Sequence, residues 1–169
     1  MILSAAKGDD ILIMGRKKNE NKKVDNVNIV NKEEKLIEWA KQNPYLTDML
    51  KINWLAEHKG SCSVAPVSGE ICVEKYIDGS SIKHYDFIFC VMLPVSDTTD
   101  GVNIENMFAL RQWQNWIDEM ERTGNYPDFG ETCGDYELQN LANSPQLAQI
   151  YDNGTAKYQF PARLVYTEG

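Results

Sequence analysis

The chain has 169 residues, 43% of them hydrophobic, and a formal net charge of −8. A chain of this length and composition can bury enough apolar surface for one domain, so global disorder is excluded. The acidic balance argues against specific nucleic-acid binding, because such proteins normally present a basic face. No run approaches the roughly 20 apolar residues that a membrane-spanning helix needs.

The four cysteines are Cys62, Cys72, Cys90 and Cys133, and they form neither a CxxC pair nor a zinc-ligand spacing. Residues 1–6 are too short for the hydrophobic region of a secretory signal. We therefore expect free thiols in a reducing cytoplasm, with no metal and no cofactor.

Residues 1–31 differ from the rest of the chain. Asp10–Gly15 includes a short apolar run typical of one strand, and Arg16–Lys23 is basic and polar. We expect residues 1–31 to be a poorly ordered N-terminal extension, followed by a single α+β domain over residues 32–169.

The domain is predicted to begin with a short helix over residues 32–42, which ends at Asn43-Pro44 because the residue before proline avoids the helical region. Alternation over residues 52–56 predicts a strand. A second strand is predicted over residues 61–67, where Pro66 places it at an edge or ends it.

The next segment predicts a β-hairpin. A strand over residues 71–77 leads into Asp78-Gly79, a dipeptide that supplies the positive φ values of a tight turn. The returning strand, residues 82–95, has apolar side chains on both faces, which indicates a central strand or one that meets another subunit.

Residues 102–123 have the periodicity of an amphipathic helix that covers the sheet. Its apolar stripe is predicted to contain Leu110, Trp113, Ile117 and Met120, extended by Met107 and Phe108. Gly124 has the position of a helix C-terminal stop.

Three strands are expected at the C-terminal end, over residues 136–141, 146–151 and 156–166. Pro161 removes one hydrogen-bond donor, which predicts that the last strand is an edge or carries a bulge. The expected fold class is thus α+β, a mainly antiparallel sheet packed by one long helix and one shorter N-terminal helix.

No catalytic template is complete in this sequence. Only His58 and His84 have side chains that ordinarily titrate near neutral pH, and each is expected in a turn or on a half-exposed strand. No HExxH, GxSxG or GxGxxG motif occurs. An acyltransferase would need a histidine base in an HxxxDG-like setting, which is absent, so we predict that the chain is not an enzyme.

Six segments support a family resemblance by their shared order. They are residues 35–39, 52–57, 74–80, 85–89, 113–127 and 156–166. Over Glu34–Thr167 the chain resembles minor-capsid or tail-terminator-like proteins, encoded in the head-to-tail gene cluster of long-tailed phages and prophages of Gram-positive bacteria.

The resemblance implies a virion morphogenesis protein that forms a ring, commonly a hexamer. Such a ring caps the tail tube and faces the head connector proteins. The implied location is the host bacterial cytoplasm during assembly and then the head–tail junction of the virion. A head-completion or minor-capsid role and a small-molecule-modifying enzyme such as an acyltransferase remain the alternatives.

Two polar loops are predicted to make contacts between subunits or with the tube, because binding residues commonly lie on loops held by a rigid scaffold. The first spans residues 96–100 and the second residues 128–135. The candidate interface residues are Ser96, Asp97, Asp100, Asp128, Glu131 and Asp135.

Overall fold

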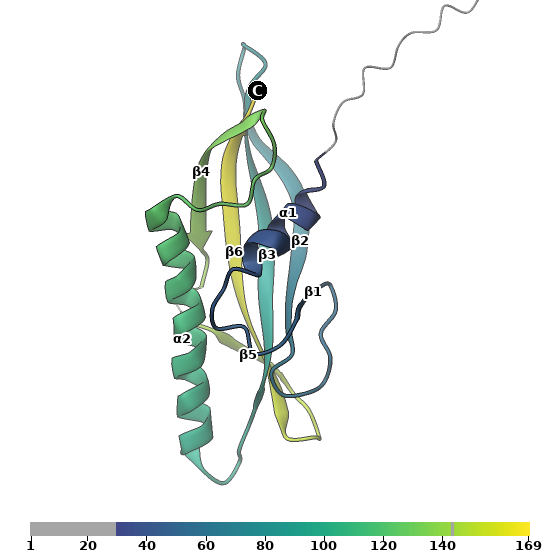
Figure 1. Ribbon diagram of the computed structural model, residues 1–169, viewed down its shortest axis with the longest axis vertical. Coiled ribbons are helices and arrows are strands. Elements are labelled where there is room, and N and C mark those ends of the chain that lie inside the picture. The colour runs from purple at the N-terminus through teal and green to yellow at the C-terminus, as the bar shows by residue number, and fades with distance from the viewer. Residues whose placement is uncertain (1–29, 143) are drawn as a thin grey trace, which may run out of the picture.

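The computed structural model describes residues 30–142 and 144–169, in which two helices cover one face of a six-stranded sheet (Figure 1). This confirms the expected α+β class. The predictions for residues 1–29, a poorly ordered extension with one short strand, lie outside the described residues. The elements are α1 Lys32–Ala40, β1 Leu50–Ile52, β2 Cys62–Lys75, β3 Ser81–Pro94, α2 Asp100–Thr123, β4 Cys133–Asn140, β5 Gln146–Ile150 and β6 Thr155–Glu168.

The strand order of the sheet is β1-β2-β3-β6-β4, and β5 also pairs with β6. Only β1 and β2 are parallel, and all other neighbours are antiparallel. β3 and β6 pair along their whole length, with Phe89 opposite Phe160. β3 is therefore a central strand, as its apolar residues on both faces predicted.

The core lies between the helices and one face of β3 and β6. Trp39 of α1 lies 4.8 Å from Trp116 of α2, measured between ring centres, so the two helices meet over the sheet. Phe89 is fully buried and contacts Trp113 at 5.5 Å and Phe160 at 5.4 Å. These large aromatic side chains pack against one another at the centre of the fold.

Local signals set the helix ends much as predicted. The side chain of Asn31 accepts a hydrogen bond from the backbone N–H of Glu34 at 3.1 Å, which caps α1. α2 ends at Gly124, whose φ of 68° is left-handed, so a residue without a Cβ is favoured there. In the described part of the chain, neither helix is long and apolar enough to cross a membrane.

The prediction of a strand over residues 52–56 is wrong. β1 stops at Ile52 because the backbone of Asn53 turns to a φ of 52°, and Trp54 is exposed instead of alternating into the core. The two strands predicted over residues 61–67 and 71–77 are one strand, β2. An irregularity in its pairing between Pro66 and Gly69 accounts for the break in the sequence pattern.

The hairpin between β2 and β3 is confirmed, with one change to its turn. Only Gly79 has a positive φ, and its N–H donates to the carbonyl of Tyr76 at 3.2 Å. The N–H of Tyr76 donates in turn to the carbonyl of Ser80 at 2.8 Å. The loop is thus a three-residue turn closed by one left-handed glycine, and Asp78 needs no positive φ.

β6 is not an edge strand, in contrast to the prediction from Pro161. β3 lies on one side of it, and β5 and β4 share the other. Pro161 falls between the stretch paired with β5, which reaches Gln159, and the stretch paired with β4, which starts at Ala162. The missing N–H therefore lies where that ladder is already interrupted.

Candidate functional site

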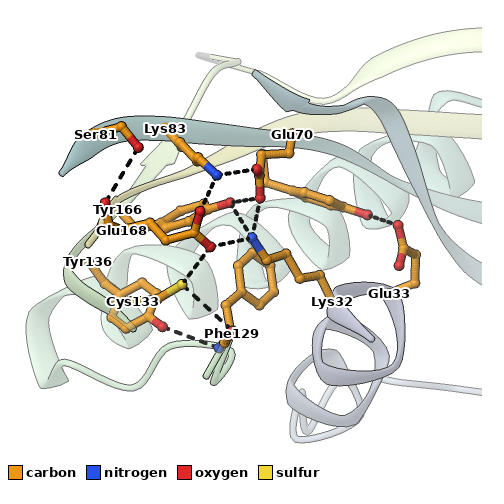
Figure 2. Close-up of polar contacts among 11 residues, drawn as sticks. Lys32, Glu33, Glu70, Ser81, Lys83, Phe129, Cys133, Tyr136, Tyr166 and Glu168 are labelled. Carbon is orange, nitrogen blue, oxygen red and sulfur yellow. Dashed lines mark hydrogen bonds and ion pairs between the residues drawn. The ribbon is translucent and has the colours of Figure 1, made fainter. Parts of the chain in front are cut away.

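Two lysines, two glutamates and a tyrosine meet where the start of α1 lies against β2, β3 and β6 (Figure 2). We call these five residues the charge cluster: Lys32, Glu70, Lys83, Tyr166 and Glu168. Each ammonium contacts both carboxylates, with Lys83 Nζ 2.5 Å from Glu70 and Lys32 Nζ 3.3 Å from Glu168. The Tyr166 hydroxyl accepts from Lys32 at 2.9 Å and donates to Glu70 at 2.6 Å.

Strand register brings the cluster together from distant parts of the sequence. Lys83 is paired with Tyr166 across β3 and β6, and Glu70 is paired with Tyr85 across β2 and β3. Lys32 is the first residue of α1 and extends over the Tyr166 ring, 4.9 Å from its centre. Cross-strand neighbours and one helix end thus place four charges within contact distance.

The cluster shifts the protonation of its own members. Burial alone would raise the pKa of Glu70, but hydrogen bonds from Lys32, Lys83 and Tyr166 outweigh it and lower that pKa to about 2. Burial opposes the charge of Lys83, yet its contacts with Glu168 and Glu70 raise its pKa. Burial and the neighbouring Glu70 carboxylate raise the pKa of Tyr166. Glu70 and Lys83 therefore stay charged, and Tyr166 stays protonated, around neutral pH.

This arrangement is suited to a structural role, holding α1 against β2, β3 and β6. A general acid or base works best with a pKa near the working pH, and the shifts above move these groups away from it. An open hollow of about 530 Å³ lies beside the cluster, lined in part by Glu70, Lys83 and Glu168. Over residues 30–142 and 144–169, no three His, Cys, Asp or Glu side chains are placed to hold a metal ion.

A second polar group lies on β3 and β6, on the sheet face opposite the helices. Asp86 accepts from Arg163 at 2.6 and 2.9 Å, and its Oδ1 lies 3.1 Å from Nδ1 of His84. The hydrogen bond from Arg163 is the main cause that lowers the pKa of Asp86. His58, the other histidine, is exposed and its Nε2 lies 3.6 Å from Asp48.

The six predicted interface residues fall into two groups at opposite ends of α2. Ser96, Asp97 and Asp100 lie at its start, whereas Asp128, Glu131 and Asp135 follow its end. A helix of 24 residues is about 36 Å long, so the two groups do not form one site.

Two of the six lie outside the loops where we expected them: Asp100 is the first residue of α2, and Asp135 belongs to β4 with a φ of 46°. The loop before α2 is held by its own hydrogen bonds. Ser96 Oγ accepts from the N–H of Thr99 at 3.1 Å, and the Asn103 side chain donates to the Ser96 carbonyl at 2.9 Å. Ser96 is half-buried, and the other five residues are exposed.

Sequence reasoning placed Phe108 on the core side of α2, and that is wrong. Phe108 and Ile104 are each 66% exposed, and both line a surface hollow of about 400 Å³ together with Asn103, Met107 and Arg111. At about 100° per residue, Phe108 lies about 160° around the helix from Leu110 and about 140° from Trp113. The spacing of residues 104, 107, 108 and 111 was the available signal for this second stripe.

The tip of the β2–β3 hairpin is a further apolar surface that the sequence analysis missed. Val73 and Tyr76 are exposed, and Ile77 is fully exposed at 109%. Apolar residues beside an Asp-Gly turn, where polar ones are usual, were the signal. In Figure 1 this hairpin extends past the end of β6, and Ser81 pairs with Glu168 at the last position of β6.

No model of a known protein family matches the sequence, and no curated protein matches it at a significant level. The surfaces and polar groups described above are therefore the structural basis on which a function can be proposed.

Proposed function

We propose that this chain is a non-enzymatic morphogenesis protein of a phage or prophage virion. In this proposal it is a tail terminator or head–tail joining component that oligomerises into a ring and caps the tail tube. The resemblance of Glu34–Thr167 to proteins of that class supports the assignment. Its partners are further copies of itself, the tail tube protein and the head connector proteins.

The observation that carries the proposal is the placement of large apolar side chains on outward surfaces. They gather on the outer side of α2, at the hairpin tip and along β5, where Leu147 and Ile150 are exposed. Scattered single apolar residues are ordinary, but several at one place indicate contact with another protein. Ring assembly needs two different surfaces on each copy, because a closed ring is built from head-to-tail contacts.

The acidic charge suits this role. A ring at the head–tail junction surrounds the path of the DNA, and negative surface charge repels phosphates instead of holding them. Such a protein would act in the host bacterial cytoplasm during assembly and would then stay at the head–tail junction.

An enzyme is the second candidate, because His84 lies beside a carboxylate in the way a catalytic base needs. However, both oxygens of Asp86 are already engaged by Arg163. Five hollows lie along α1, α2 and the hairpin in residues 30–142 and 144–169, and neither histidine lines any of these five. These observations favour assembly over catalysis.

The test is the mass of the full chain in solution, by light scattering, over a range of concentrations. We expect a discrete oligomer whose electron micrographs show rings, and tubes capped at one end when purified tail-tube protein is added. A strict monomer that leaves the tubes uncapped would contradict the proposal. A parallel assay of acetyl transfer from acetyl-coenzyme A with Asp86→Asn as the control would detect the alternative activity.

A further inference from the structure

Two apolar surfaces of the chain lie too far apart to contact each other within one copy. The hairpin tip, residues 73–80, precedes β3, whereas the hollow on the outer side of α2 follows the other end of β3. A strand of 14 residues is roughly 45 Å long, and α2 begins beyond its far end (Figure 1). Contact between the two surfaces therefore requires two molecules.

We propose that the hairpin tip of one copy binds in the α2 hollow of the next copy, and that this is the repeating contact of the assembly. The inference rests on the proposed ring, and it names the two surfaces that form it. The partner is a second copy of this chain. Because the two surfaces differ, each copy uses one of each, which is the head-to-tail arrangement that a ring needs.

The hairpin tip is fixed in shape before it binds. Its turn is closed by two backbone hydrogen bonds, and Asp78 accepts from the N–H of Ser80 at 3.0 Å and from the Ser80 hydroxyl at 2.7 Å. β2 and β3 are paired up to Lys75 and Ser81, directly below the turn. A rigid element that presents Tyr76 and Ile77 loses little conformational entropy when it docks.

The α2 hollow offers matching chemistry. Ile104, Met107 and Phe108 give it an apolar surface, and about 400 Å³ is enough room for an isoleucine and part of a tyrosine. Arg111 also lines the hollow and makes no ion pair with any residue of 30–142 or 144–169. Asp78 at the hairpin tip likewise has no cationic partner there. An apolar centre with one opposite-charge pair at its edge is the usual layout of a protein interface.

The experiment uses two full-length variants, Ile77→Asp and Phe108→Asp, each with one of the two surfaces damaged. Both side chains are outward, so both variants should keep the circular dichroism spectrum of the wild type. We expect each variant alone to be a monomer by light scattering. Mixed in equal amounts, they should form a dimer that grows no further, because only one intact tip and one intact hollow remain.

Met49→Asp is the matched control, since Met49 is 71% exposed but belongs to neither surface. This variant should assemble like the wild type. A second pair, Asp78→Arg and Arg111→Asp, tests the charge contact. Each alone should weaken assembly several-fold. Their combination in one chain should recover a large part of that loss, because it restores the charge pair with the signs exchanged, while the hydrogen bonds from Ser80 to Asp78 remain lost.

Several results would overturn the contact. If both apolar variants assemble normally while the wild type forms rings, the tip–hollow contact is refuted and the ring proposal stands. If only Ile77→Asp dissociates and the mixture gives no dimer, the tips bind each other or another surface. Dissociation of the Met49→Asp control would refute the selectivity of the two surfaces. A wild type that is monomeric at all concentrations overturns both proposals.

Discussion

The two sides of α2 carry similar apolar side chains that have opposite environments. On the inner side, Trp113 and Ile117 are buried against the sheet, whereas Phe108 and Ile104 on the outer side are each 66% exposed. The inner residues hold the fold together, and the outer ones contribute little to it. Composition alone does not distinguish the two roles, and position on the helix does. Substitutions on the two sides should therefore separate stability from assembly.

The largest effect on the free energy of unfolding is expected from a substitution in the core. Phe89→Ala removes a fully buried ring that contacts Trp113 and Phe160. The lost contacts and the remaining cavity should lower the free energy of unfolding by about 3 to 5 kcal/mol. Urea denaturation followed by tryptophan fluorescence measures this, and Phe89→Leu should lose clearly less. A loss below about 1 kcal/mol for the alanine variant would mean that the aromatic core is not the main support of the sheet.

The second effect concerns the charge cluster, on the helix-covered side. The folded pKa of Glu70, about 2, lies below its ordinary value of 4.5, so its contribution to stability is present above pH 4.5 and is lost as the pH falls towards 2. At pH 7, Glu70→Gln should lower the free energy of unfolding by about 1 to 2 kcal/mol, after allowance for partial solvent screening.

The pH dependence is the sharper readout of this second effect. Urea midpoints of the wild type and Glu70→Gln should converge between pH 4.5 and 2, because protonation of Glu70 removes the same charge as the substitution. Glu57→Gln, in the exposed loop after β1, is the control and should follow the wild type throughout. A constant difference at all pH values would show that the variant acts through packing instead of charge.

An element of the fold could be predicted from the sequence when the residues that determine it are neighbours in the chain. The hairpin and α2 follow from neighbouring residues, Asp78-Gly79 and the stripe that ends at Gly124, and both are confirmed. β1 was misplaced because it exists through parallel pairing with β2, which no local pattern shows. The prediction that Pro161 marks an edge strand failed for a similar reason. β4 and β5 pair with different stretches of the same side of β6, and no local pattern shows where those stretches end.

The candidate sites were less accessible than the fold. Lys32 and Glu168 are separated by 136 positions, so the charge cluster forms only once β2, β3 and β6 pair and the start of α1 packs against them. The outer stripe of α2 was visible as a spacing of three and four residues. Phe108 was nevertheless assigned to the core stripe as an extension alongside Met107, although adjacent helical residues point about 100° apart.

A smaller effect is expected on the sheet face opposite the helices. Arg163→Ala removes both hydrogen bonds to Asp86 and leaves that carboxylate beside His84. Because both partners are partly exposed, the loss should be about 1 kcal/mol in the free energy of unfolding. The free energy of unfolding of Arg163→Lys should lie between those of the wild type and Arg163→Ala, since an ammonium cannot replace the bidentate contact of a guanidinium. A loss above about 3 kcal/mol would mean that this face is more fully buried than its exposure indicates.

The smallest effect on stability is expected on the outer side of α2. It tests directly whether the inner side supports the fold and the outer side does not. Phe108→Ser should change the free energy of unfolding of the monomer by no more than about 0.5 kcal/mol, because the ring contacts mainly solvent within one copy. The measurement must be made at concentrations where light scattering shows a monomer, since assembly itself would stabilise the wild type. At higher concentrations the wild type should gain stability through assembly. Phe108→Ser should not, because its outer α2 surface is damaged. A loss of about 2 kcal/mol or more in the dilute monomer would show that Phe108 supports the fold itself, and the distinction between the two sides of α2 would fail.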